Sequence, residues 1–344
     1  MSALLLRRGS VSVRLRRRTL VTTVLSALAL LVLAVLGLGL GEYAVAPGQV
    51  LAALVGRGED PLAAYFVTEV RAPRVLTALV VGAALGVAGA IFQNVTGNPL
   101  GSPDIIGFTT GAATGALVQI IVVGADTRGV ALGALLGGLA TAGLVHLLTR
   151  RHGLNGQRLV LVGLGVGATL AALNTLLVVR ASLVAAQTAA QWLAGSLNAV
   201  LWPRATLTLV AVAVLLALTV PLARPLSMLV LGDDVCRAAG IPVQRVRGAA
   251  VLVAVCLVSV ATAATGPIAF VALAAPQIAR RLAGSAVPGL LGPALTGAVM
   301  VLGSDLAAQR LLAPTELAVG VVTGAVGGLY LIVLLTTEWR KGHR

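Results

Sequence analysis

Few side chains in the sequence have the type and spacing needed for chemistry at a reactive centre. The two cysteines, Cys236 and Cys256, have no Cys or His at ligand spacing, and the three histidines show no HExxH pattern. The carboxylate pair Asp233-Asp234 has no second acidic cluster to complete a metal site. The chain also lacks a GxxxxGK(S/T) nucleotide-binding loop. We therefore expect no catalytic residue, no metal and no cofactor, and we expect that the chain does not hydrolyse ATP by itself.

The positive charge is the second feature that could indicate a binding partner. Of 25 basic residues 24 are Arg, and the formal net charge is +14. On a soluble protein this balance would suggest nucleic acid. Here the aromatic residues, 3% of the chain, do not alternate with basic runs. Membrane proteins retain cytoplasmic loops through Arg and Lys, which explains the charge without nucleic acid.

The composition shows which elements must position these residues. Hydrophobic residues make up 58% of the 344-residue chain, charged residues make up 10%, and the mean hydropathy is +1.01. Soluble domains carry about 25% charged residues, so an ordinary cytosolic enzyme is excluded. Because a spanning helix needs roughly 20 apolar residues, the chain has enough for about ten spans. We predict an all-α polytopic membrane protein.

Apolar runs between polar breaks predict ten spans. An Arg-rich cytoplasmic N-terminus (1–19) precedes a single transmembrane domain (20–336) and a cytoplasmic tail (337–344). The first apolar run is about 21 residues long, which favours a retained span over a signal peptide. The segment 268–282 is short and lies between Pro267 and Gly284, so it could be a tilted or broken helix. The predicted spans are 20–40, 74–93, 105–124, 129–149, 159–179, 205–223, 248–265, 268–282, 290–309 and 316–336.

The distribution of basic residues predicts the orientation of these spans. With both termini inside, the cytoplasmic pieces hold 18 basic residues and the external pieces hold seven. This asymmetry favours N-in and C-in.

Two similar breaks indicate an inverted internal repeat. Residues 96–100 (TGNPL) follow the second span, and residues 265–268 (TGPI) follow the seventh. In the predicted topology these two spans run in opposite directions, which is the arrangement of inverted repeats with broken helices at matching places. Irregular backbone at membrane depth is tolerated only when it is buried in protein or lines a cavity.

Five motifs occur in the order and spacing of a known family. They are RxPR at 71–74, NPLxxPxxxG at 98–107, LGxxxxxxxG at 231–240, GPIxFVxLxxPxIAR at 266–280 and GVVTxxxG at 320–327. With them the chain, from about residue 45 to 336, resembles the FecCD-type permease subunits of iron–siderophore and cobalamin ABC importers. The segments 92–93, 101–104, 194–198 and 327–331 are most similar to the branch for ferric enterobactin and other catecholates. The chain departs from the family pattern at Gln277, where many members have His, and at Gln309, where some have Arg.

The resemblance implies a transport function and a set of partners. The chain would move an iron(III)–siderophore chelate of the catecholate type across the bacterial cell (inner) membrane. It would work with cytoplasmic ATP-binding subunits, an extracytoplasmic siderophore-binding protein and a second permease chain.

A cobalamin or haem permease of the same family is the alternative. An ion-coupled secondary transporter would need intramembrane carboxylates, for which Asp305 is the nearest candidate. A membrane-embedded enzyme would need the carboxylate cluster that the sequence lacks.

The resemblance also assigns roles to particular residues. The loop 224–247 would contact the ATPase, although its arginines could equally hold a solvated loop inside. External arginines would pair with carboxylates of the binding protein, although they could instead extend to the membrane interface. Spans 159–179 and 316–336 would line the translocation path. The coupling residues are Leu231, Gly232, Asp233, Asp234, Arg237, Ala238 and Gly240; the docking residues are Arg71, Arg74 and Arg310; the path residues are Asn174, Thr175 and Thr323; and the structural positions are Asn98, Pro99, Pro103, Gly266, Pro267 and Pro276.

Overall fold

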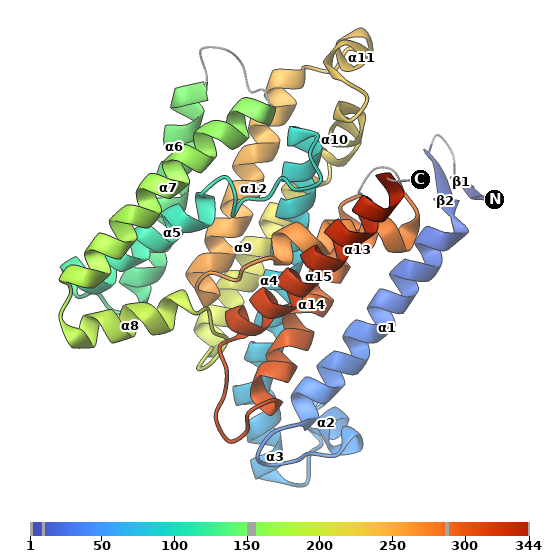
Figure 1. The fold of residues 1–344 in the computed structure, drawn as a ribbon. Coiled ribbons are helices and arrows are strands. Elements are labelled where there is room, and N and C mark those ends of the chain that lie inside the picture. Colours follow the sequence, from blue (N-terminus) through green and yellow to red (C-terminus); the bar gives the residue numbers. More distant parts are fainter. Residues whose placement is uncertain (1–2, 9–10, 150–155, 286–288, 343–344) are drawn as a thin grey trace.

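The chain folds into a bundle of helices preceded by a short hairpin (Figure 1). The computed structural model describes residues 3–8, 11–149, 156–285 and 289–342. Strands β1 (Ala3–Arg8) and β2 (Val11–Arg16) pair antiparallel, with Ala3 opposite Arg16 and Arg8 opposite Val11. This hairpin was not predicted. The helices that follow are α1 (Arg17–Gly39), α2 (Pro47–Leu54), α3 (Pro61–Tyr65), the π-helical η1 (Phe66–Arg71), α4 (Ala72–Thr96), α5 (Phe108–Leu117), the π-helical η2 (Val118–Val123), α6 (Thr127–Thr149), α7 (Gly156–Arg180), α8 (Leu183–Leu193), α9 (Trp202–Thr219), α10 (Ala223–Leu229), α11 (Asp233–Ala238), α12 (Val243–Thr265), α13 (Val271–Ala283), α14 (Leu291–Arg310) and α15 (Val319–Gly342).

The prediction of an all-α membrane protein is confirmed, and each predicted span overlaps a helix. Within the described residues, seven helices are long and apolar enough to cross a membrane, and two further apolar helices are shorter. The count of ten spans therefore stays a prediction. Helices α1 and α15 extend beyond the predicted domain limits at 20 and 336, and where the membrane begins and ends along them also stays a prediction.

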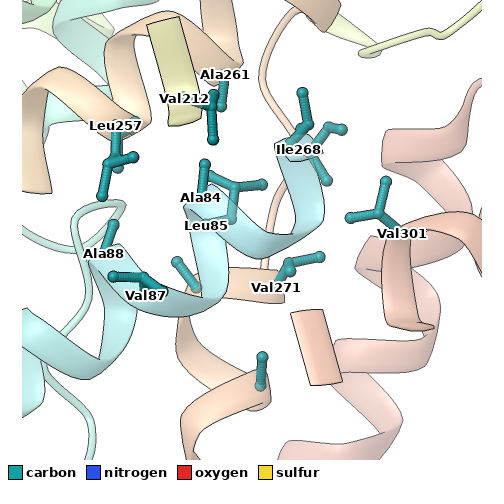
Figure 2. Close-up of a cluster of buried hydrophobic side chains, with 14 of the residues drawn as sticks. Ala84, Leu85, Val87, Ala88, Val212, Leu257, Ala261, Ile268, Val271 and Val301 are labelled. Atoms are coloured by element: carbon teal, nitrogen blue, oxygen red, sulfur yellow. The ribbon is translucent and has the colours of Figure 1, made fainter. Parts of the chain in front are cut away.

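Helix α4 forms the centre of the bundle and packs against α9, α12, α13 and α14. Its buried face carries small and branched apolar residues, which let neighbouring helices approach closely. Figure 2 shows Ala84, Leu85, Val87 and Ala88 of this helix among side chains of the surrounding elements. Those neighbours include Val212, Leu257, Ala261, Ile268, Val271 and Val301.

Three glycines of α4 lie against the backbone of other helices. A Cβ atom on Gly82 would collide with the carbonyl of Gly297, one on Gly86 with that of Pro293, and one on Gly89 with that of Ala272. Since backbone cannot rotate away as a long side chain can, these positions require glycine.

We expect Gly89→Ala to destabilise the protein by about 1–3 kcal/mol or more, because overpacking forces the surrounding backbone to shift. Gly143→Ala on α6 is the matched control, since an added Cβ there meets no atom within 4 Å. Thermal unfolding midpoints in detergent measure the difference. Equal midpoints for the two variants would show that α4 and α13 separate at little cost.

The breaks after α4 and α12 fit the predicted inverted repeat. Gly97 ends α4 with φ 63°, and Gly266 ends α12 with φ 74°. Figure 1 shows α4 starting at the α3 end of the bundle and α12 starting beside α11 at the opposite end. The packing partners also correspond. The second predicted span (α4) packs on the ninth (α14), and the seventh (α12) packs on the fourth (α6), so a shift of five spans relates the two pairs. The N- and C-terminal segments lie at the end that carries α10 and α11 (Figure 1).

Candidate functional site

The predicted coupling residues lie together in one exposed turn. Helix α11 is present as a short helix, and glycines with positive φ flank it: Gly232 at 99° and Gly240 at 77°. Its buried residue is Cys236, whose Sγ donates to the carbonyl of Met228 at 3.1 Å. Ala238 is exposed. The turn therefore presents side chains outward from the end of the bundle that holds the termini.

The charged side chains of this turn form ion pairs within the chain. Arg237 lies 2.9 Å from Asp234 and 3.6 Å from Asp233; Arg237 and Asp234 are largely exposed, whereas Asp233 is partly buried. Asp233 also pairs with Arg247 of α12 through two contacts of 2.7 and 3.0 Å. The second pair was not predicted, because Arg247 seemed only to add positive charge to the loop.

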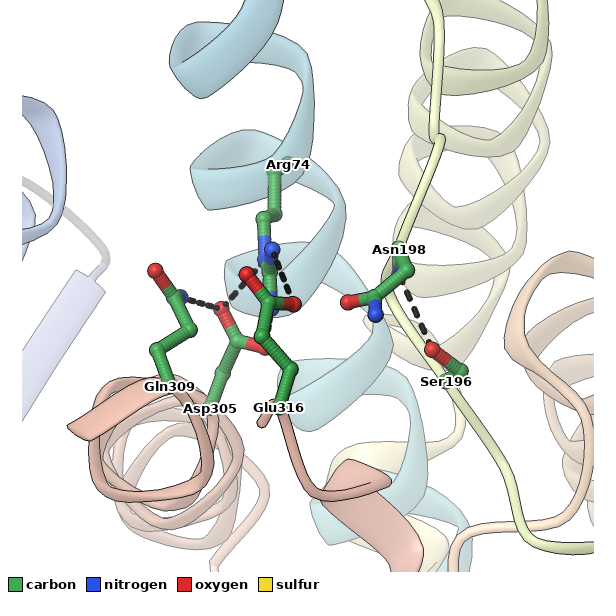
Figure 3. A network of polar contacts seen from close by, with 6 residues as sticks. All are labelled: Arg74, Ser196, Asn198, Asp305, Gln309 and Glu316. Carbon is green, nitrogen blue, oxygen red and sulfur yellow. Dashed lines mark hydrogen bonds and ion pairs between the residues drawn. The ribbon is translucent and has the colours of Figure 1, made fainter. Parts of the chain in front are cut away.

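At the opposite end of the bundle, Arg74 is held by two carboxylates (Figure 3). Its Nη2 and Nε lie 2.9 and 3.0 Å from the two oxygens of Asp305, and its Nη1 lies 3.3 Å from Glu316. Gln309 donates to Asp305 at 2.9 Å. The Asp305 side chain is 2% exposed and that of Glu316 is 42% exposed. Arg74 therefore joins α4 to the end of α14 and to the segment before α15.

Arg71 is buried and caps the end of α1. Its Nη1 donates to the carbonyls of Leu38 and Gly39 at 2.9 and 3.1 Å, and its Nη2 donates to that of Tyr43 at 2.5 Å. The guanidinium carbon lies 5.7 Å from the centre of the Phe66 ring. The last carbonyls of a helix lack partners within the helix, so this cation satisfies them. A contact between Arg71 and another protein would require these bonds to break.

Arg310 is the third predicted docking residue, and it is exposed. Its Nη2 donates to the carbonyl of Gly41 at a long 3.3 Å. The structure thus places all three arginines at the end of the bundle opposite α11 but leaves Arg310 the most accessible of them. Docking through these residues stays a prediction.

A pocket of about 350 Å³ opens beside Arg74 and was not predicted. Tyr65, Glu69 and Trp202 line it together with Leu197 and the segment 199–201. The Trp202 indole donates to the carbonyl of Thr68 at 2.9 Å, which holds α9 against η1. The sequence contained no sign of this pocket, because its walls come from segments about 130 residues apart.

The predicted path residues do not share one surface. Thr175 of α7 is exposed and donates to the carbonyl of Ala171 in its own helix. Thr323 of α15 is fully buried and donates to the carbonyl of Gly320. Asn174 has a buried Oδ1 that accepts no hydrogen bond from the described residues. The role of these residues in a translocation path stays a prediction.

Buried glutamines hold the irregular backbone after α4. Gln277 of α13 donates to the carbonyl of Pro99 at 2.6 Å and to the side chain of Gln93 at 2.9 Å. Gln93 donates in turn to the carbonyl of Leu273. Within the loop, Asn98 accepts from the N–H of Leu100 at 2.9 Å. Side chains of the protein thus bind the carbonyl of Pro99 and the N–H of Leu100, which lie in irregular backbone.

The second break is tied to two neighbouring segments. The carbonyl of Thr265 accepts from the N–H of Ser196 at 2.7 Å, and the carbonyl of Gly195 accepts from the N–H of Gly320 at 3.2 Å. Gly266 and Gly195 approach so closely that a side chain on either would collide with backbone. Within α13, Pro276 is buried. The end of α12 is thus bonded, through Ser196 and Gly195, to the first turn of α15.

Comparisons with known proteins agree on one family. The model of the FecCD transport family matches residues 29–337. The ferric enterobactin transport system permease protein FepG of Escherichia coli (strain K12) is 47% identical over 94% of this chain and 98% of its own. The achromobactin transport system permease protein CbrC of Dickeya dadantii (strain 3937) is 38% identical over 94% of this chain and 95% of its own. A solved structure described as an inward-facing conformation of a metal-chelate type ABC transporter has a TM-score of 0.82 and 28% identity, covering 92% of this chain and 98% of its own.

Proposed function

The chain belongs to the FecCD transport family, and from this premise we propose that it is the permease subunit of an ABC importer for a catecholate siderophore such as ferric enterobactin. The observation that carries the substrate assignment is the 47% identity to the ferric enterobactin permease over nearly the full length of both chains. The similarity in fold to a metal-chelate ABC transporter supports the same class of cargo.

The proposed assembly has three kinds of protein component. Two copies of the permease, or this chain and a related one, enclose the path. ATP-binding subunits contact the turn around α11, and an extracytoplasmic binding protein delivers the chelate at the opposite end. The iron crosses as a preformed chelate. In this assembly the permease is not an enzyme, because ATP is hydrolysed on the separate subunits.

The test of this function is ATP-dependent uptake into vesicles that contain the complete importer. We expect radiolabelled ferric enterobactin to accumulate only when ATP and the binding protein are both present. Uptake of cyanocobalamin or haem instead would assign the chain to another branch of the family. Uptake driven by a proton or sodium gradient without ATP would indicate a secondary transporter.

We further propose that both termini lie in the cytoplasm. The motivation is the excess of basic residues on the predicted inner side, together with the position of α8 at the end of the bundle away from both terminal segments (Figure 1). Reporter domains fused after residue 344 and inserted in the segment 181–203 should report opposite sides of the membrane. A signal from the same side for both fusions would exclude this topology.

A further inference from the structure

The short helix α11 is tied to α12 by one bidentate ion pair. The two guanidinium nitrogens Nη2 and Nη1 of Arg247 lie 2.7 and 3.0 Å from the two carboxylate oxygens of Asp233. The Arg247 side chain is 12% exposed and that of Asp233 is 30% exposed. This parallel arrangement fixes direction as well as distance, and it is stronger than a single contact. The pair between Arg237 and Asp234 lies within α11 and is exposed, so it contributes little.

A glycine, the residue type with the greatest backbone freedom, lies on each side of α11 in the chain. Gly232 precedes the helix and Gly240 follows it, and neither has another atom near the position of a Cβ. A six-residue helix between two such glycines can pivot unless side chains hold it. Cys236 anchors one side of the helix against the carbonyl of Met228. Asp233 anchors it to α12.

Helix α12 connects this ion pair to the other end of the bundle. Arg247 lies in the second turn of α12, which then runs through the buried core to Thr265. The carbonyl of Thr265 accepts from the N–H of Ser196, and the neighbouring Gly195 accepts from the N–H of Gly320 in α15. A displacement of α12 along its axis therefore reaches the start of α15 through backbone hydrogen bonds. Packed helices transmit such a displacement because their interfaces are not continuously deformable.

We propose that the Asp233–Arg247 ion pair transmits the ATP-driven displacement of α11 to α12, so that Arg247 is a positioning residue for transport. This inference rests on the proposed function as an ABC permease. It predicts that breaking the pair separates ATP hydrolysis from transport without removing the ATP-binding subunits. If the pair only stabilised the fold, its loss would reduce ATP hydrolysis and transport alike.

The experiment compares Arg247→Gln with Arg17→Gln in the reconstituted importer. Arg17 is exposed at the start of α1, away from the turn around α11, and the two variants remove the same charge. For Arg247→Gln we expect at least a tenfold loss of chelate uptake, with copurified ATP-binding subunits and ATP hydrolysis within about twofold of wild type. Arg17→Gln should transport normally. Arg247→Lys should be intermediate, because Lys keeps the charge but cannot form the bidentate pair.

A charge exchange makes the test decisive. Asp233→Arg and Arg247→Asp should each abolish uptake, and the double variant should recover a substantial part of it. Normal uptake in Arg247→Gln would overturn the proposal, as would a parallel loss of uptake, hydrolysis and subunit binding in that variant. The absence of ATP-dependent uptake in wild type would instead refute the proposed function.

Discussion

Replacement of Ala238 by Trp is expected to abolish ATP-driven uptake while the protein still inserts at normal abundance. Ala238 is the last residue of α11, and its side chain is exposed, so the indole meets no atom that the fold must move. In the proposed importer the same ring would have to fit between the permease and its ATP-binding subunit, and packed contacts tolerate added volume poorly. Gly240→Trp is also expected to abolish uptake. It is less informative, because a φ of 77° would strain the Trp backbone within the permease itself.

The control for Ala238→Trp is Val55→Trp at the opposite end of the molecule. Val55 is 67% exposed, so the added ring leaves the fold equally undisturbed. Uptake at matched membrane abundance and copurification of the ATP-binding subunit are the two measurements. Wild-type uptake in Ala238→Trp would remove this turn from the mechanism.

Loss of the Arg74 side chain should give the largest change in stability. Asp305 is 2% exposed, and Arg74→Ala would leave its charge buried without a cation. Breaking a buried pair in this way costs about 3–5 kcal/mol. The double variant Arg74→Leu/Asp305→Leu should recover much of that loss, because it removes both charges together.

Glu316→Gln is the matched control, since Glu316 contacts the same arginine but is 42% exposed. An exposed pair is worth about 0–1 kcal/mol, so the unfolding midpoint of Glu316→Gln in detergent should stay close to wild type. If Arg74→Ala were no less stable than Glu316→Gln, the pair with Asp305 would not hold α4, α14 and the start of α15 together.

The contacts of Arg71 and Arg74 within the chain change how docking of the binding protein should be tested. Charge reversal at Arg71 and Arg74 would break bonds within the permease, and any loss of uptake would then follow from instability. Arg310→Glu changes an exposed charge and should weaken association with the binding protein by like-charge repulsion. Binding-protein affinity at unchanged unfolding midpoint is the measurement. Unchanged affinity would exclude Arg310 from the docking surface.

The sequence was sufficient to find the long apolar helices, because their signal is local. Each span required only a run of apolar residues, and Gly97 and Gly266 marked where runs end. The short helix α8 was missed because it lies in a loop between two spans. Ser182 accepts from the N–H of Ala185 at its start, and this cap was the available signal. The strands β1 and β2 were missed although residues 11–16 (VSVRLR) alternate apolar and polar residues.

The partners of the site residues could not be predicted, because they lie far apart in sequence. Asp305 and Glu316 lie 231 and 242 residues after Arg74, and no local pattern indicates that they meet. Gln277 was noted only as a departure from the family pattern, and its bonds to Gln93 and Pro99 appear only in the fold. The coupling residues around α11 could be named together because the family motif LGxxxxxxxG places all of them within ten positions.

The continuous helical segment from Pro61 to Thr96 has a consequence for the response to the bilayer. Its 36 residues measure about 54 Å at 1.5 Å per residue, which exceeds a hydrocarbon core of about 30 Å. Other helices shield it from lipid, since 78% of its most apolar stretch is buried, whereas only 6% of the corresponding stretch of α1 is buried. We therefore expect hydrophobic mismatch in a thinner or thicker bilayer to change the tilt of α1 more than that of this segment. The segment should keep its position in the bundle, and with it the distance between Arg74 and the end that carries α11.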